Sequence, residues 1–388
     1  MNILTLNKIA ACGTDLFDKA KYTVGDAVEE PVGILVRSAA MHDMELPESV
    51  LAIGRAGAGT NNIPVDACAE KGIVVFNTPG ANANAVKELV LCGLLLASRK
   101  VVSGIEWAKS LKPEGDAVAK LVEKGKGQFV GPEILGKKLG VIGLGAIGGM
   151  VANAADALGM QVYGYDPYMS VQAAWGLNPS IHQVSDMNEI FTTCDYISLH
   201  VPCLDSTKGM INAETIGMMK TGVRILNFAR GELVNNADMI AALETGKVAR
   251  YVTDFPNADL LDVVGVVPLP HLGASTPESE DNCAVMAARA LVDYLERGNI
   301  KNSVNYPSVS LPDSELPRLC VFHRNVANML SQITSVIAGE GINIENLANG
   351  SKGNYAYTLI ETADEVGAAI CERISAIEGV IRVREINA

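Results

Sequence analysis

The sequence has few aromatic residues, fewer basic than acidic side chains, and no apolar run long enough to cross a membrane. Its 388 residues include 44 Asp and Glu against 31 Lys and Arg, which gives a formal net charge of −13. This balance disfavours nucleic acid or an anionic membrane as a partner, although a local basic patch can still bind a small anion. The longest apolar run, residues 89–97, is far shorter than the roughly 20 residues that a membrane helix needs.

Cysteine pairs with a metal-binding or redox spacing are also missing. The eight cysteines are scattered through apolar surroundings, with no Cys-x-x-Cys and no nearby histidine in a metal-ligand spacing. They predict reduced thiols, mostly in the core, and no metal site. Residues 1–5 lack the basic segment and apolar stretch of a secretion signal, so the sequence predicts a cytoplasmic protein.

A glycine-rich turn near the middle of the chain is the clearest functional signal. An apolar segment, residues 139–142, enters Gly-x-Gly-x-x-Gly, and a helical pattern follows. We expect Gly143 to permit a tight turn, Gly145 to let a pyrophosphate approach the backbone, and Gly148 to let the helix pack closely on the strand. This strand, turn and helix predict a dinucleotide-binding fold.

An acidic residue stands where such a fold needs one. The predicted helix ends at Gly159, a second strand covers 161–165, and Asp166 follows it, about 20 residues beyond the turn as expected for a ribose ligand. A carboxylate at this place accepts hydrogen bonds from a ribose and repels a 2′-phosphate. The pattern therefore predicts NAD, and not NADP, as the cofactor.

Short buried strands alternate with helical stretches in the first part of the chain, at residues 3–6, 32–36, 50–53 and 73–76. This alternation predicts a parallel α/β unit that binds ligands at the carboxyl ends of its strands. Arg37 and Arg55 follow two of those strands. One arginine alone is better explained by a surface ion pair, but two at neighbouring strand ends favour the binding of an anion such as phosphate.

The second half of the nucleotide unit predicts strands at 196–201, 224–228 and 263–269, and one that ends near Asp254. Arg230 and His271 come just after strand ends, on the side where ligands are expected. His271 stands in a tight, irregular segment. Two interpretations are open for it: a general acid or base, or a hydrogen-bonded structural histidine.

The C-terminal part predicts a linker and a third domain. Residues 302–317 contain three prolines and several serines and asparagines, as in a linker, and the elements that follow have the β-α-β-β-α-β order of a ferredoxin-like fold. The apolar run 89–97 exceeds one buried helical stripe and predicts packing against another subunit, in a homodimer or homotetramer.

Six motifs, taken in order, resemble the D-isomer-specific 2-hydroxyacid dehydrogenase family over essentially the whole chain. They occupy residues 53–59, 76–79, 143–148, 198–202, 227–231 and 270–276. The resemblance is to the short forms that oxidise 3-phospho-D-glycerate to 3-phosphooxypyruvate, the entry to serine synthesis, and it identifies the tail as an ACT domain, a ligand-sensing module. The implied fold is two doubly wound parallel α/β domains plus this tail. The implied boundaries are 1–98 with 283–303 for substrate, 99–282 for NAD, 304–317 for the linker and 318–388 for the ACT domain.

The resemblance implies roles for particular residues. Arg230 would hold and polarise the substrate, and His271 would be the acid/base, consistent with the needs of hydride transfer from an alcohol. Asp259 falls where the family has the glutamate that pairs with this histidine, and Asp262 is the alternative. The implied NAD-binding residues are Gly143, Gly145, Ala146, Ile147, Gly148, Asp166, Val201, Pro202, Phe228, Ala229, Arg230, Asp254, His271, Gly273 and Ala274. The implied substrate ligands are Arg37, Arg55, Gly57, Ala58 and Asn82.

The tail raises the question of regulation. His323, Asn325 and Asn343 stand where serine-sensitive relatives capture L-serine, but the Pro-Gly of those relatives is Ala327-Asn328 here. The alternative is a module that only assembles subunits. For the whole chain, two other functions remain open: a general 2-hydroxyacid dehydrogenase or hydroxypyruvate reductase, and an NAD-sensing interaction protein similar to the corepressors that share this fold.

Overall fold

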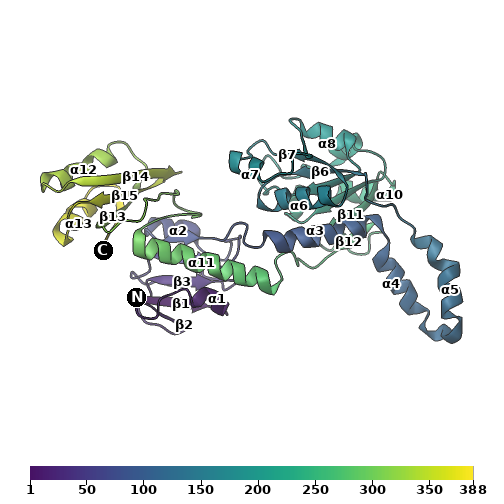
Figure 1. Cartoon of the computed structure of the whole chain (residues 1–388), viewed down its shortest axis with the longest axis horizontal. Coiled ribbons are helices and arrows are strands. Elements are labelled where there is room, and N and C mark those ends of the chain that lie inside the picture. The colour runs from purple at the N-terminus through teal and green to yellow at the C-terminus, as the bar shows by residue number, and fades with distance from the viewer. Residues whose placement is uncertain (388) are drawn as a thin grey trace. The chain divides into compact units, whose positions relative to one another are not determined.

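The computed structural model describes residues 1–387, so Ala388 of the predicted third domain lies outside the described residues. The chain divides into two compact units. The first unit combines Met1–Asn82 with the segment from Thr276 onward, and the second unit is Ala83–Ser275. Each contains a parallel sheet (Figure 1), and each is described by itself below.

The first unit holds a five-stranded parallel sheet in the order β2-β1-β3-β4-β5. The strands are β1 (Asn2–Leu6), β2 (Thr23–Gly25), β3 (Gly33–Val36), β4 (Ala52–Arg55) and β5 (Val74–Phe76). The helices are α1 (Ala11–Thr14), α2 (Val65–Glu70) and the long α11 (Pro277–Arg297). Both faces of the sheet are covered, which explains why its strands are short continuous apolar runs. The predicted α/β unit is confirmed, and β2 is a strand that the sequence pattern missed.

The second unit is a doubly wound sheet in the order β12-β11-β10-β9-β6-β7-β8. Its strands are β6 (Lys138–Ile142), β7 (Gln161–Tyr165), β8 (His182–Gln183), β9 (Tyr196–Leu199), β10 (Val223–Asn227), β11 (Val248–Thr253) and β12 (Val266–Pro268). Its main helices are α3 (Ala83–Ser98), α6 (Ala146–Ala157), α7 (Val171–Trp175), α8 (Met187–Thr193), α9 (Ala213–Met218) and α10 (Asn236–Glu244). The strand order reverses at β6 and β9, so ligands are expected at the carboxyl ends of these two strands.

A helical arm interrupts the second unit between α3 and β6. It consists of α4 (Val101–Ser110), α5 (Val118–Gly125) and the short turns η1 (Lys112–Ala117) and η2 (Lys126–Phe129). Figure 1 shows α4 and α5 projecting away from the sheet of their own unit. The two ends of the arm pack together, because Trp107 of α4 contacts Phe129 of η2 with their ring centroids 5.2 Å apart.

The helix α3 belongs to the second unit, although the expected boundary placed it with the substrate domain. Val86, Val90 and Leu94 of α3 are buried in the core of the nucleotide sheet, next to Val141 and Leu226. The apolar run that predicted a subunit contact is thus largely explained by packing within the chain. Leu95, half exposed, is the main apolar residue of the run left on the surface.

The C-terminal segment forms an antiparallel sheet in the order β14-β15-β13-β16, with two helices on one face. The elements are β13 (Arg318–Arg324), α12 (Met329–Gly339), β14 (Ile344–Lys352), β15 (Tyr355–Thr362), α13 (Ala368–Ser375) and β16 (Val380–Ile386). This is the predicted ferredoxin-like order. The expected separation from the body is not found, because Phe322 and Tyr357 on the other face share one core with Tyr294 of α11.

The predicted linker is packed into the first unit. Tyr306 is fully buried and its hydroxyl donates to the carbonyl of Ala69 at 2.6 Å. Asn305 accepts from the N–H of Val75 and donates to the carbonyl of Ile73. Composition alone suggested a free connection, but these side chains supply the partners that dock the segment on β5.

The helices of the described residues include none that combines the length and the apolar character of a membrane span. All eight cysteines are free thiols, and Cys68, Cys194, Cys283 and Cys320 are buried.

Candidate active site

The glycine turn between β6 and α6 has the geometry that its sequence predicts. Gly143 adopts φ +91°, a conformation that favours glycine, and its N–H donates to the carbonyl of Tyr165. A Cβ on Gly148 would lie 1.8 Å from the carbonyl oxygen of Gly143, so helix and turn meet too closely for any side chain. A Cβ on Gly145 would meet no atom within 4 Å among the described residues, which leaves the backbone open on that side.

The helix α6 begins at Ala146 and Ile147, directly after this open glycine. The backbone N–H groups in the first turn of a helix have no partners within the helix, and together with the helix dipole they favour an anion. The structure thus forms the phosphate-binding element that the motif predicts.

A cavity of about 480 Å³ lies beside the turn, at the ends of β6, β7 and β9. Gly143, Gly145, Asp166, Val201 and Pro202 all line it, so the structure brings these predicted NAD ligands together. The carboxylate of Asp166 accepts 2.9 Å hydrogen bonds from the N–H groups of Leu144 and Tyr168. These bonds fix the carboxylate at the end of β7, on the wall of the cavity.

His200 lines the same cavity and was not assigned a role from the sequence. Its Nε2 is hydrogen-bonded at 2.8 Å to the hydroxyl of Ser198. Burial lowers the pKa of His200 to about 4, so the imidazole is neutral at pH 7. A Cβ on Gly143 would lie 2.6 Å from the carbonyl oxygen of His200, so the two backbones approach closely. The backbone of His200 therefore lies directly against the glycine turn.

Arg230 follows β10 on a short loop that Asn227 holds in place. The buried side chain of Asn227 donates to the carbonyl of Arg230 at 2.8 Å and accepts from the N–H groups of Ala229 and Arg230. The guanidinium of Arg230 is exposed and donates to the carbonyl of Ala229. Asn227 therefore positions the Arg230 loop, and an asparagine at the end of a mainly apolar strand, directly before this loop, is the sequence signal that could have identified it. Phe228, the residue after Asn227 in the sequence, is buried against Gly93 of α3.

His271 is held in an uncommon conformation at the end of β12. Its φ is +23°, and its N–H donates to the carbonyls of Asp254 and Leu269, each at 3.1 Å. Residues with such backbone angles persist where surrounding contacts enforce them, and they cluster at functional sites. The imidazole is exposed and lies against the ring of Phe255, at 4.7 Å between centroids. The imidazole makes no hydrogen bond among the described residues, which favours the acid/base interpretation over that of a hydrogen-bonded structural histidine.

Asp254 is the carboxylate that the structure brings to His271 and Arg230. It is 2% exposed, and one carboxylate oxygen, Oδ1, has no partner among the described residues. Burial raises the pKa of Asp254, while the nearby charges of His271 and Arg230 and the N–H of Gly273 act in the opposite direction. A Cβ on Gly273 would lie 3.4 Å from this carboxylate, so Gly273, followed by Ala274, approaches it closely.

Asp259 and Asp262 are not brought to His271 by any contact in the described structure. Asp259 is exposed and accepts from the side chain of Asn257 at 3.3 Å, and Asp262 is exposed at φ +64°. Counting along the family motif placed the partner of His271 in this loop. The loop instead turns these two carboxylates to solvent, whereas the Asp254 carboxylate is close enough to His271 for the two charges to interact.

Two of the other predicted substrate ligands, Arg37 and Gly57, lie near Arg55 in the first unit. Its Nε is buried and has no partner among the described residues, and burial, together with the like charge of Arg37, lowers the pKa of Arg55 from its ordinary value. The guanidinium lies over Gly57, whose added Cβ would be 1.4 Å from Nη1. Asn77 donates to the carbonyl of Ala58, which fixes the Gly57–Ala58 loop.

Arg37 has a partner already. Its Nη2 donates to Glu280 of α11 at 2.7 Å, and both side chains are nearly half exposed. Arg37 therefore forms the kind of surface ion pair that was the alternative interpretation of this arginine. Asn82 directly precedes α3, and its role as a substrate ligand stays a prediction.

The three predicted effector residues do not form one site within a chain. His323 is buried, and both ring nitrogens are hydrogen-bonded, to the carbonyl of Arg324 and the hydroxyl of Thr358. Asn325 donates to the carbonyl of Gly353 at one end of the C-terminal sheet. Asn343 lies next to Ala363, beyond the other end of the sheet, so the whole of β15, about 23 Å long, separates the two asparagines.

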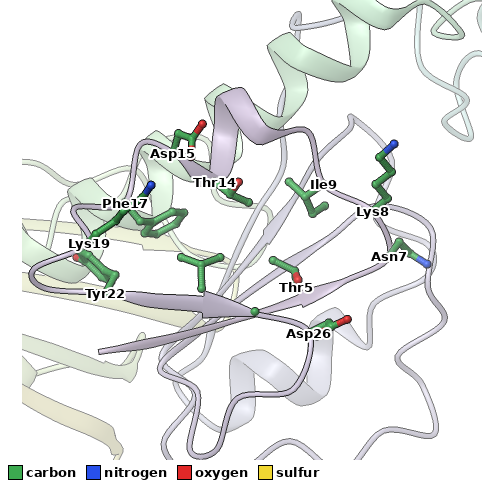
Figure 2. Close-up of a pocket in the computed structure, with 12 residues that line it drawn as sticks. Thr5, Asn7, Lys8, Ile9, Thr14, Asp15, Phe17, Lys19, Tyr22 and Asp26 are labelled. Carbon is green, nitrogen blue, oxygen red and sulfur yellow. The ribbon is translucent and has the colours of Figure 1, made fainter.

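A separate hollow of about 810 Å³ lies at the ends of β1 and β2 (Figure 2). Its walls come from these strands and from the crossover that joins them, which contains the four-residue helix α1. The predicted substrate ligands instead follow β3, β4 and β5, so this hollow is a different feature of the first unit.

The doubly wound sheet, the phosphate-binding turn and the arginine and histidine beyond its strand ends define an NAD-dependent dehydrogenase. A family model described as "D-isomer specific 2-hydroxyacid dehydrogenase, NAD binding domain" matches residues 94–273. D-3-phosphoglycerate dehydrogenase of Haemophilus influenzae is 31% identical, over 98% of this chain and 93% of its own. The enzyme of that name from Escherichia coli is 34% identical, over 87% of this chain and 82% of its own. The chain belongs to the D-isomer-specific 2-hydroxyacid dehydrogenase family.

Solved structures agree with this assignment. An NAD⁺-bound 3-phosphoglycerate dehydrogenase of Entamoeba histolytica has a TM-score of 0.57 and 27% identity, over 79% of this chain and 98% of its own. A glyoxylate reductase from Paecilomyes thermophila has a TM-score of 0.62 and 25% identity, over 78% of this chain and 98% of its own.

Proposed function

We propose that the enzyme oxidises 3-phospho-D-glycerate to 3-phosphooxypyruvate with NAD as the oxidant. The observation that carries the substrate choice is Arg55, a guanidinium with a buried, unpartnered Nε at the carboxyl end of β4. A buried cation without a counter-ion suits an anionic group of the ligand, such as a phosphate. The names of the relatives from Haemophilus influenzae and Escherichia coli support the same substrate.

The residues of the second unit fit NAD. The open face of Gly145 and the first turn of α6 suit a pyrophosphate, Asp166 suits a ribose, and the unpartnered Oδ1 of Asp254 suits an amide donor such as the nicotinamide carboxamide. When bound, NAD supplies the hydride acceptor. Asp166 places a negative charge where NADP carries its extra phosphate, so the preference is for NAD.

We assign the proton transfer to His271. An alcohol loses its hydroxyl proton as it becomes a ketone, and a neutral imidazole is a suitable base near pH 7. The imidazolium that forms is stabilised by the carboxylate of Asp254. Arg230 supplies a positive charge for the carboxylate and the forming carbonyl oxygen of the substrate.

The proposal is tested by following NADH absorbance with a panel of 2-hydroxy acids and, in reverse, of 2-oxo acids. We expect phosphorylated substrates to have the highest kcat/KM. Arg55→Ala should mainly raise the KM for phosphorylated substrates, because it removes a contact to a remote, non-reacting group. A loss confined to kcat would place Arg55 at the reacting carbon instead.

A general 2-hydroxyacid dehydrogenase is the second candidate, and the similarity to the glyoxylate reductase favours it. Such an enzyme would reduce glyoxylate or hydroxypyruvate better than phosphooxypyruvate. An NAD-sensing corepressor-like protein would show no turnover with any substrate of the panel.

We further propose a homodimer or homotetramer that works in the cytoplasm. Val101, Val102 and Ile105 of the arm are each about half exposed, and apolar side chains grouped on one helix suit burial by a second copy. Eight free thiols suit a reducing compartment. Light scattering of wild type and of Val102→Glu tests the assembly, because a charge in this contact should shift the protein toward the monomer.

L-serine is the proposed effector of the C-terminal sheet. Because Asn325 and Asn343 lie at opposite ends of that sheet, we propose a site that two copies complete together, with Asn343 of one facing Asn325 of the other. The bonds already made by His323 assign it to support of β13. Asn343→Ala should abolish inhibition by L-serine with little change in the uninhibited rate. Calorimetry without a binding signal at millimolar L-serine would leave the sheet as an assembly module.

A further inference from the structure

The substrate end of the first unit contains two arginines and one carboxylate that competes for them. Arg37 directly follows β3, and Val36 at the end of β3 pairs with Arg55 at the end of β4, so the two arginines stand at neighbouring strand ends. Glu280, in the first turn of α11, accepts from Arg37 at 2.7 Å. Arg55 makes no ion pair among the described residues.

We propose that Glu280 is a specificity-determining residue, which competes with the substrate's remote anion for Arg37 and thereby limits the preference for phosphorylated over uncharged substrates. This inference rests on the proposed function, and it adds a residue to which that function assigned no role. Its physical basis is the balance of charge around the two guanidinium groups.

Without substrate, the two arginines and Glu280 together carry one positive charge. A phosphate monoester carries about 1.5 to 2 negative charges at pH 7. With Glu280 still paired to Arg37, the bound phosphate would leave the site with excess negative charge. The phosphate therefore gains most when it replaces the Glu280 carboxylate on Arg37.

The exposure of the pair makes this exchange feasible. The side chains of Arg37 and Glu280 are 42% and 45% exposed, and ion pairs at such exposure are weak because water and salt screen them. Glu280 also gains from its place in the first turn of a helix, which favours a carboxylate with or without Arg37. A dianion can thus displace Glu280, while a substrate with an uncharged end gives Arg37 no alternative partner.

The test replaces the carboxylate by its amide. In Glu280→Gln, the KM for 3-phosphooxypyruvate should fall about two- to fivefold, the range expected from the loss of an exposed ion pair. The KM for unphosphorylated hydroxypyruvate should stay within twofold of wild type. Glu278→Gln is the matched control, because Glu278 stands in the same first turn, is exposed, and makes no ion pair among the described residues.

Two further measurements test whether Glu280 acts on substrate binding through Arg37. The effect of Glu280→Gln should vanish in an Arg37→Ala background, as in a double-mutant cycle. Binding of inorganic phosphate, measured by calorimetry on the full-length protein, should tighten in Glu280→Gln and not in Glu278→Gln. This binding experiment requires no turnover.

The outcomes separate the two claims. A wild-type enzyme that does not accept phosphorylated substrates would overturn the proposed function, while phosphate binding would still test the competition at Arg37. Equal behaviour of Glu280→Gln and Glu278→Gln, equal KM changes for both substrates, or an effect that survives in Arg37→Ala would each overturn the role of Glu280.

Discussion

The ring of Phe255 lies against the imidazole of His271, with centroids 4.7 Å apart and planes inclined by 54°. Phe255 follows directly after Asp254, whose carbonyl accepts from the N–H of His271. One short segment after β11 therefore restrains the histidine twice, through its backbone and through its ring. The orientation of the proposed base depends on this segment.

Phe255→Leu should reduce kcat about tenfold while leaving the affinity for NAD nearly unchanged. The imidazole loses its contact with the aromatic ring, and a base that is less well oriented toward the substrate slows the reaction. His271→Ala should reduce kcat by about two to four orders of magnitude, since the proton acceptor itself is lost. Steady-state rates and NAD titrations by fluorescence measure both effects. Wild-type turnover in His271→Ala would remove its proposed role.

Asp166→Ser should weaken NAD binding roughly tenfold or more and relax the discrimination against NADP, because an acceptor for the ribose and a repulsive charge vanish together. Asp166→Asn separates the two causes, since the amide keeps one acceptor oxygen and removes the charge. The ratio of kcat/KM for NAD and NADP is the readout. An unchanged ratio in both variants would mean that the ribose binds elsewhere.

Gly57→Ala should raise the KM for phosphorylated substrates about tenfold, because the new methyl group occupies the place of the Arg55 guanidinium and the φ of +150° is unfavourable for alanine. Gly59→Ala is the control, since its Cβ would only touch the Asn61 side chain at 3.6 Å. Similar KM values in the two variants would contradict the importance of the Arg55 position.

The low pKa of His200 predicts a pH dependence of stability. The neutral imidazole is favoured in the folded state, with a pKa of about 4 against 6.5 for the ordinary group. As the pH falls from 6.5 toward 4, the unfolded chain takes up the proton first, so the contribution of His200 to stability is present above this window and is lost within it. His200→Asn should flatten the decline of the unfolding midpoint over this range. The exposed His182→Asn is the control and should leave the slope as in wild type.

Local features of the sequence predicted the nucleotide unit well. The turn at Gly143, the close approach at Gly148 and the strand before Asp166 depend on neighbouring residues, so the pattern carries them. The strand order follows from the same alternation of strands and helices. The β-α-β-β-α-β tail was predicted for the same reason.

Contacts between distant residues could not be read from the pattern. Arg37 and Glu280 are 243 positions apart, and nothing near either one indicates the ion pair. The proximity of Asp254, and not Asp259, to His271 depends on how the segment between them folds back. Residues 302–317 have the composition of a linker, but Asn305 and Tyr306 find buried partners on β5 and α2 that only the folded chain supplies.

The most direct test of the proposed activity is the ratio of kcat/KM for 3-phosphooxypyruvate to kcat/KM for hydroxypyruvate, measured with NADH on the wild-type enzyme. Two arginines at the strand ends of the first unit predict a ratio well above one, and Arg55→Ala should lower it through the KM of the phosphorylated substrate. A ratio at or below one in the wild type would contradict the phosphorylated substrate and favour a general 2-hydroxyacid dehydrogenase.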